Sequence, residues 1–107
     1  MPALFSNTLL VEESKLPKIL EIGPYIIYFW SNENNEPVHV HIAVKTPSQN
    51  GTKVWLTQAG DAIVANNKSN IPEDKLNKLL KVISDNFFYI CEKWIDKFGK
   101  ETLKFYC

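Results

Sequence analysis

The chain has 107 residues, of which 45% are hydrophobic and 12% aromatic, and its twelve basic and twelve acidic side chains cancel to a net charge of zero. A chain of this length fits one domain, and this apolar content offsets the ordering entropy that keeps polar chains disordered. A dedicated nucleic-acid binder usually carries a basic excess, which is absent here.

The beginning of the chain gives no sign of export. Residues 1–16 are expected to form an N-terminal extension without the basic first region of a signal peptide. The longest strongly apolar run, from Tyr25 to Trp30, is much shorter than the ~20 residues that a membrane helix needs. Cys91 and Cys107 are too few for a disulfide framework. We therefore expect a cytoplasmic protein that does not use a membrane.

Four segments of the predicted single domain, residues 17–99, are expected to be strands. Residues 25–31 are aromatic and β-branched without polar alternation, which is typical of a strand covered on both faces. Residues 38–45 alternate, and residues 52–57 and 62–65 complete the set. In the alternating strand one face carries Val38, Val40, Ile42 and Val44, and the other carries His39, His41, Ala43 and Lys45.

The connection between the second and third strands leaves the register open. A two-residue turn at Asn50-Gly51 would place Leu56 on the histidine face and Trp55 on the valine face. A bulge near Pro47 would reverse both assignments, because a slip of one residue turns every side chain to the other face. We favour the bulge, since it groups Leu56 with the valines.

One long helix is predicted over residues 72–98, with a kink or break near Asp85-Asn86 as an alternative. Asn70 is the expected N-cap, Glu73 has the spacing of a capping box, and Gly99 is the expected C-cap. Residues 100–107 form a tail that could add an edge strand. A single apolar stripe runs along the helix through Leu76, Leu80, Ile83, Phe87, Ile90, Trp94 and Phe98.

These elements predict an α+β fold, in which an antiparallel meander of three to four strands is covered on one face by a long C-terminal helix. The helix would lie on the valine face. The histidine face would be left for solvent, the N-terminal extension or a partner. An uncovered sheet edge or the tail could also support a homodimer.

His39 and His41 are the candidate catalytic residues. On a strand their Cβ atoms lie roughly 6.5–7 Å apart on one face, and two histidines can share acid and base roles as metal-independent ribonucleases require. Lys45 and Lys53 could then hold phosphate, and Trp55 could stack on an RNA base.

Two other interpretations stay open. No cofactor is required, but zinc could be held by His39, His41 and Glu36, with Glu33 or Asp61 as other choices for the third ligand. The plainest alternative is that both histidines are half-buried strand residues bonded to the neighbouring Asn/Glu loop. Glu33 and Glu36 would then be turn residues rather than partner-binding carboxylates.

Several segments of the sequence together form a recognisable signature. They are Ile22-Gly23, the aromatic strand, Ser31-Asn32-Glu33, Glu36-Pro37-x-His39-Val40-His41, Trp55-Leu56 and Ala65-Asn66. It resembles that of small bacterial proteins known as domain of unknown function four-one-six-zero. The likeness covers about residues 16–98. This chain departs from that pattern in its N-terminal extension, in a longer hairpin loop at residues 45–52, and in Val38, where a second proline is common.

The resemblance implies the toxin-like component of a two-gene pair, with a small partner protein encoded nearby as the antitoxin. It implies no catalytic residues. Our first hypothesis is a toxin-like protein that acts on RNA or protein through the His39/His41 face. The alternative is a non-catalytic protein-interaction module, and a metal-dependent hydrolase is the third option.

Overall fold

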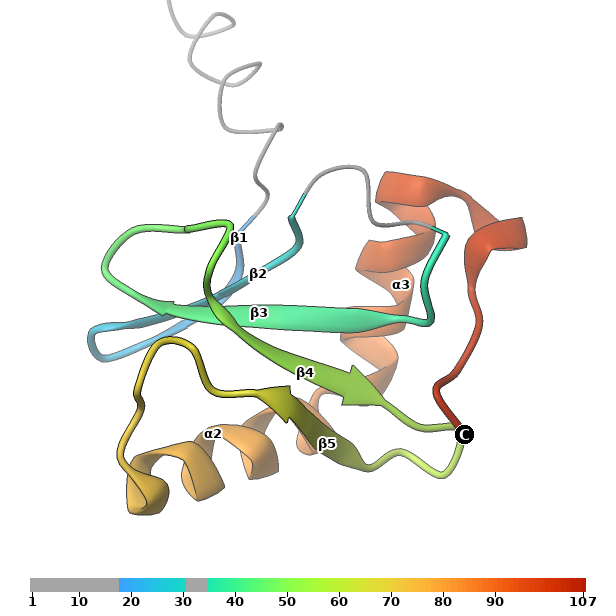
Figure 1. The fold of residues 1–107 in the computed structure, drawn as a ribbon. Coiled ribbons are helices and arrows are strands. Elements are labelled where there is room, and N and C mark those ends of the chain that lie inside the picture. Colours follow the sequence, from blue (N-terminus) through green and yellow to red (C-terminus); the bar gives the residue numbers. More distant parts are fainter. Residues whose placement is uncertain (1–17, 31–34) are drawn as a thin grey trace, which may run out of the picture.

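A computed structural model of the chain describes residues 18–30 and 35–107. Its centre is one antiparallel sheet of five strands, which lie side by side in the order of the sequence (Figure 1). The predicted α+β class and antiparallel meander are thus confirmed, and the expected count of three to four strands was too low. The strands are β1 (Lys18–Ile22), β2 (Tyr25–Tyr28), β3 (His39–Val44), β4 (Thr52–Leu56) and β5 (Ala62–Asn66).

The strand missed from the sequence is β1, at one edge of the sheet. It pairs with β2 across a tight turn in which Gly23 has a φ of 57°, a left-handed conformation that suits glycine. Only Ile19 of this strand is buried. Its apolar residues Ile19, Leu20 and Ile22 do not alternate regularly with polar ones, so the period-two pattern of a half-buried strand is not there to reveal it.

The pairing of β3 with β4 settles the open register. His39 lies opposite Trp55, and Val40 lies opposite Val54. Directly opposed residues share a face, so Trp55 is on the histidine face and Val54 is on the valine face, as the favoured arrangement predicted. This register needs no bulge at Pro47, because residues 45–51 form a longer connection between the strands.

Two helices replace the single long helix. They are α2 (Glu73–Asp85) and α3 (Phe87–Phe98), and the break lies at Asn86, in agreement with the alternative of a kink or break near Asp85-Asn86. The side chain of Asn86 donates a hydrogen bond to the carbonyl of Val82 at 2.8 Å. Such a local bond competes with the regular helix ladder and favours a change of direction at this residue. As predicted, Gly99 is the C-cap of α3, with a φ of 101°.

The predicted capping box of the first helix is wrong. The residue before α2 is Pro72, and no side chain caps the helix. Asn70 instead adopts a left-handed turn with a φ of 55°. The segment is held by Asn67, whose side-chain oxygen accepts from the backbone N–H of Ile71 at 3.1 Å and whose amide donates to the Ile71 carbonyl at 3.0 Å.

The sheet and both helices contribute to one core. Residues from β3, β4, α2 and α3 form a single buried cluster that includes Val40, Val54, Ile83, Ile90 and Trp94. No helix in residues 18–30 and 35–107 is long and apolar enough to cross a membrane.

After α3 the chain forms the short 3-10 helix η1 (Lys100–Thr102) and then runs back along the end of the sheet (Figure 1). The backbone N–H of Val38 donates to Lys104 at 2.7 Å, and that of Tyr106 donates to Leu56 at 3.3 Å. The tail is not a regular strand, but it is hydrogen-bonded to the residue before β3 and to the last residue of β4.

Candidate functional site

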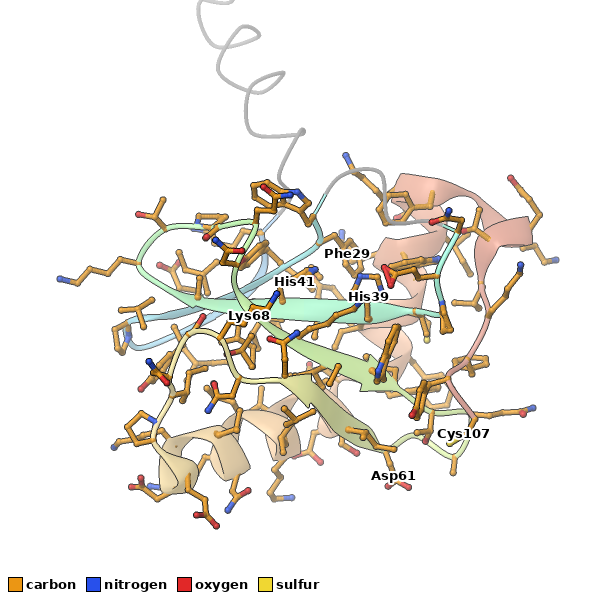
Figure 2. The ribbon with its side chains drawn as sticks, viewed as in Figure 1. Phe29, His39, His41, Asp61, Lys68 and Cys107 are labelled. Carbon is orange, nitrogen blue, oxygen red and sulfur yellow. The ribbon has the colours of Figure 1, made fainter. Side chains whose placement is uncertain are left out.

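β3 places the two histidines on the same side of the sheet, two residues apart, where Figure 2 shows them. Their ring centroids are 5.3 Å apart, and the rings are nearly perpendicular. On the two neighbouring strands, Tyr28 and Lys53 both lie opposite His41, so their side chains are on the same face of the sheet. The predicted pair is therefore present, and it sits in the middle of the sheet.

The pair is buried. His39 is 1% exposed and His41 is 4% exposed. Three aromatic rings contact them: Tyr28 stacks on His41 with centroids 5.6 Å apart, while Trp55 and Trp94 meet His39 edge-on at 5.4 and 5.5 Å. These five residues are called the histidine–aromatic cluster below. Such ring contacts add to the stability of the sheet beyond the area they bury.

The ring of His39 is held by a hydrogen bond to the backbone. Its Nδ1 lies 2.8 Å from the carbonyl oxygen of Pro37. A carbonyl can only accept, so Nδ1 carries a proton and donates this hydrogen bond. A hydrogen bond of this kind fixes ring orientation, both in structural histidines and in catalytic ones.

Lys53 and Glu36 form an ion pair beside the cluster. The Lys53 ammonium lies 2.6 and 3.2 Å from the two carboxylate oxygens of Glu36, and 4.4 Å from the ring centre of Trp55. The charge that was predicted to hold phosphate is therefore already neutralised by a carboxylate of the same chain.

Trp55 also stacks on Tyr106 from the tail, with centroids 5.2 Å apart and planes within 9°. Tyr106 is 50% exposed, and Ile63 lies opposite Trp55 on β5 and is exposed as well. We call Trp55, Ile63 and Tyr106 the aromatic patch. It forms the outer part of the histidine-bearing face.

Of the predicted site residues that the structure describes, Lys45 is not brought to the cluster. Lys45 lies beyond the end of β3, four residues from His41 or about 13 Å along an extended chain. Its φ of 69° takes the backbone out of the strand. Glu33 lies outside the described residues.

The proposed metal ligands do not form a cluster in the part of the chain that is described. No group of three His, Cys, Asp or Glu side chains there could hold a metal ion. Glu36, the third ligand in that hypothesis, is bonded to Lys53 instead.

Sequence reasoning missed Tyr28, Trp94 and Tyr106. Tyr28 could have been placed on the histidine face only by knowing the β2–β3 register. Trp94 was assigned to the core, which it joins, and it contacts His39 as well. Tyr106 lies in the tail, where the weak alternation of side chains gave no sign of a stacking partner.

Comparison with known proteins gives one match. A family model described as "Domain of unknown function (DUF4160)" matches residues 25–95, a span that includes both histidines, Glu36, Lys53 and Trp55. Tyr106 lies outside it. No curated protein and no solved structure matches the chain. Because the matched span is more than half of the sequence, the chain belongs to the DUF4160 family, a domain of unknown function.

Proposed function

We propose that the chain is a non-catalytic protein-interaction module that docks a partner protein through the aromatic patch. The observation that carries this proposal is the burial of His39 and His41, at 1% and 4% exposure. A catalytic acid or base must come within about 3 Å of the atom it protonates or deprotonates. The imidazole rings of His39 and His41 are enclosed by Tyr28, Trp55 and Trp94. They therefore stabilise the sheet beneath the protein surface and do not form part of a surface that a substrate could reach.

The chemistry of the patch favours protein over RNA. The patch combines the exposed Tyr106 with the partly buried Trp55 on which it stacks, and aromatic residues of this kind beside a neutralised ion pair are typical of the centre of a protein interface. RNA binding would need free cations for phosphate and an open ring for base stacking. Here Lys53 is paired with Glu36, and Trp55 is already stacked on Tyr106.

The resemblance supplies the kind of partner. We expect a small protein encoded next to this gene, in a cytoplasmic pair of the toxin–antitoxin type in which this chain is the toxin-like component. The toxic effect would then come from binding a target or from being released by the partner, and not from chemistry at the histidines.

A ribonuclease is the second candidate. Two observations favour it: the hydrogen bond from His39 Nδ1 to the Pro37 carbonyl fixes the ring, and the ring centre of a second histidine lies 5.3 Å away. A nuclease would need the cluster to open so that a phosphodiester reaches both rings.

Binding to the product of the neighbouring gene tests the first candidate. Purified chain and neighbour should form a complex in calorimetry, and Tyr106→Ala should raise the Kd at least ~10-fold, as loss of an interface aromatic residue does. Phe88→Ala is the matched control, because Phe88 is 84% exposed on α3, outside the patch. The absence of a complex, or equal losses in both variants, would contradict docking at the patch.

Growth after induction of the chain alone separates the two candidates. The variant His39→Asn keeps a donor near the position of Nδ1 and removes Nε2, so the fold should persist while proton transfer is lost. Growth arrest that survives His39→Asn but is relieved by Tyr106→Ala supports the interaction module. The reverse pattern, with RNA cleaved by the purified chain, would establish the nuclease instead.

A further inference from the structure

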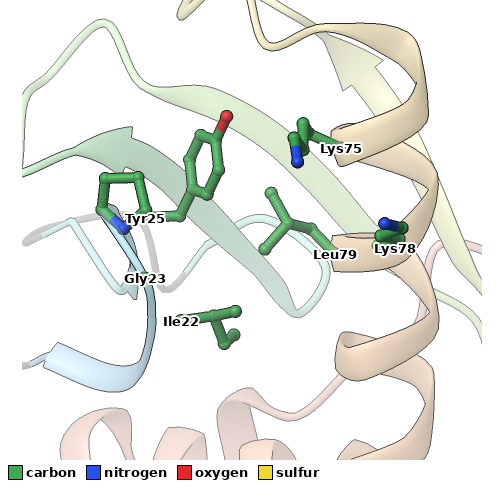
Figure 3. Close-up of a pocket in the computed structure, with 7 residues that line it drawn as sticks. Ile22, Gly23, Tyr25, Lys75, Lys78 and Leu79 are labelled. Atoms are coloured by element: carbon green, nitrogen blue, oxygen red, sulfur yellow. The ribbon is translucent and has the colours of Figure 1, made fainter.

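A separate hollow lies on the other face of the sheet, between the β1–β2 turn and α2. It has a volume of about 350 Å³ and opens to solvent on one side. Figure 3 shows the hairpin residues on one wall and the helix residues on the other. The hollow is lined by Ile22, Gly23, Pro24, Tyr25, Lys75, Lys78 and Leu79.

The floor of the hollow is apolar and fixed in place. Leu79 is buried in the main core, and Ile22 and Tyr25 pack against the same core from β1 and β2. A wall that belongs to the core keeps its shape when a ligand enters, so little ordering is needed on binding.

The rim is positive. Lys75 and Lys78 are three residues apart on α2 and therefore lie on the same side of the helix. Neither makes an ion pair: the pairs within the described residues join Lys18 to Glu21, Lys53 to Glu36 and Lys81 to Asp85. No carboxylate is among the lining residues. Two uncompensated ammonium groups beside an apolar floor are complementary to an anion attached to an apolar body.

We propose that this hollow binds a small carboxylate with a compact apolar body. The apolar part would rest on Ile22, Tyr25 and Leu79, and the carboxylate would meet Lys75 and Lys78. The volume is at the lower end of the range for small-molecule sites, about 300 to 1,000 Å³. That size suits one small ligand better than an extended peptide, which would need a continuous groove. The site is independent of the function proposed above.

The test is a titration of the full chain with 4-phenylbutyrate, followed through backbone amide shifts in NMR. We expect saturable shifts at Gly23, Tyr25, Lys75 and Leu79 with a Kd of about 1 mM, which is the affinity that a ligand of this size reaches at typical efficiency. The neutral amide of the same compound should bind about tenfold more weakly, and acetate should not saturate at ~10 mM, because each lacks one of the two required features.

The double variant Lys75→Gln/Lys78→Gln should raise the Kd for 4-phenylbutyrate about tenfold. The matched control is Lys68→Gln/Lys100→Gln, which removes two exposed lysines that do not line the hollow and should leave the Kd unchanged. Shifts away from the hollow, equal binding of the neutral amide, or no saturation would overturn the proposal. Saturation of the same amides by an acidic, leucine-containing peptide but not by 4-phenylbutyrate would also overturn it and assign the hollow to a peptide.

Discussion

Glu36 and Lys53 are 17 residues apart in the chain, yet both carboxylate oxygens of Glu36 lie within 3.2 Å of the Lys53 ammonium. The pair is partly buried and lies next to Trp55. It joins Glu36, which precedes β3, to the second residue of β4, the strand next to the one that carries the histidines. Because of this contact the Lys53 ammonium is already paired and is not available to bind phosphate. The same contact holds Glu36 against the sheet.

The ion pair should contribute measurably to stability. Glu36→Gln should lower the free energy of unfolding by about 1 kcal/mol, because the pair is bidentate and only partly exposed to solvent. Lys81→Gln is the matched control, since its pair with Asp85 is exposed and should contribute less than about 0.5 kcal/mol. Urea denaturation followed by tryptophan fluorescence measures both. Equal effects in the two variants would show that the Glu36 pair is no stronger than an ordinary surface contact.

Gly51 is required by a close approach to Tyr28. A Cβ at residue 51 would collide with the Tyr28 hydroxyl and would come within 3.1 Å of the Ile42 carbonyl. That hydroxyl accepts from the Ser48 backbone N–H at 2.9 Å and donates to the Ser48 carbonyl, so it cannot move away freely. Gly51→Ala should therefore cost about 2–3 kcal/mol in unfolding free energy.

A double-mutant cycle identifies the cause of that loss. Tyr28→Phe removes the clashing oxygen, so Gly51→Ala should be less costly in the Tyr28→Phe background than in the parent chain, by at least about 1 kcal/mol. Additive losses would mean that the cost comes from elsewhere than the Tyr28 hydroxyl.

Asn67 should matter far more than its neighbour Asn66. The Asn67 side chain bonds the Thr52 hydroxyl at 2.7 Å and both backbone groups of Ile71. Asn67→Ala should cost about 2–3 kcal/mol, because it leaves these partly buried groups without partners. The side chain of Asn66 accepts one exposed bond, from Lys68, so Asn66→Ala should cost less than about 0.5 kcal/mol. Hydrogen exchange at the Ile71 amide should accelerate only in the Asn67 variant.

The two thiols should differ in reactivity. Burial raises the pKa of the Cys91 thiol above its ordinary value, while Cys107 is exposed. At pH 8 one thiol per folded chain should react quickly with iodoacetamide, and the second at least ~10-fold more slowly, because less of it is thiolate and access is restricted. The variant Cys107→Ser should abolish the fast phase. A fast phase that persists would place the reactive thiol at Cys91.

The same shift gives a dependence of stability on pH. A thiol that ionises more easily in the unfolded chain favours unfolding once the pH exceeds its unfolded pKa of about 8.5. The contribution of Cys91 is therefore fully present below that pH and is lost as the pH rises toward its raised, folded pKa. Cys91→Ala should remove this part of the alkaline destabilisation, as urea denaturation between pH 7 and pH 10 (roughly the range in which a thiol titrates) would show.

The sequence was most informative where the cause of the structure is local. Alternation placed His39 and His41 together because the strand period is two, and Gly99 was placed because a helix end favours glycine. The break at Asn86 was also foreseeable, since its side chain bonds within its own turn. Each of these depends on residues within four positions of one another.

The site needed information that the sequence does not carry locally. The burial of His39 comes from Trp55 and Trp94, which reach it through strand register and helix packing. The pairing of Lys53 with Glu36 depends on where the loop before β3 lies. Alternation along the strand assigns Lys45 to the histidine face, but Lys45 lies beyond the end of β3, where its positive φ takes the backbone out of the strand. The alternation of residues along a strand predicts the face to which a side chain points. A site also depends on contacts with residues that are distant in the sequence.

The hydrogen bonds between the tail and residues 38, 56 and 58 affect the order in which the domain can form. Val38 directly precedes β3, the strand that carries the histidines. Its backbone N–H can form its hydrogen bond to the Lys104 carbonyl only after Lys104 has been made, 66 residues later in synthesis. The aromatic patch likewise lacks one of its three members until Tyr106 has been added. A growing chain therefore cannot complete the aromatic patch before residues 104–107 have been added, so docking at the patch is expected only once these residues have been made.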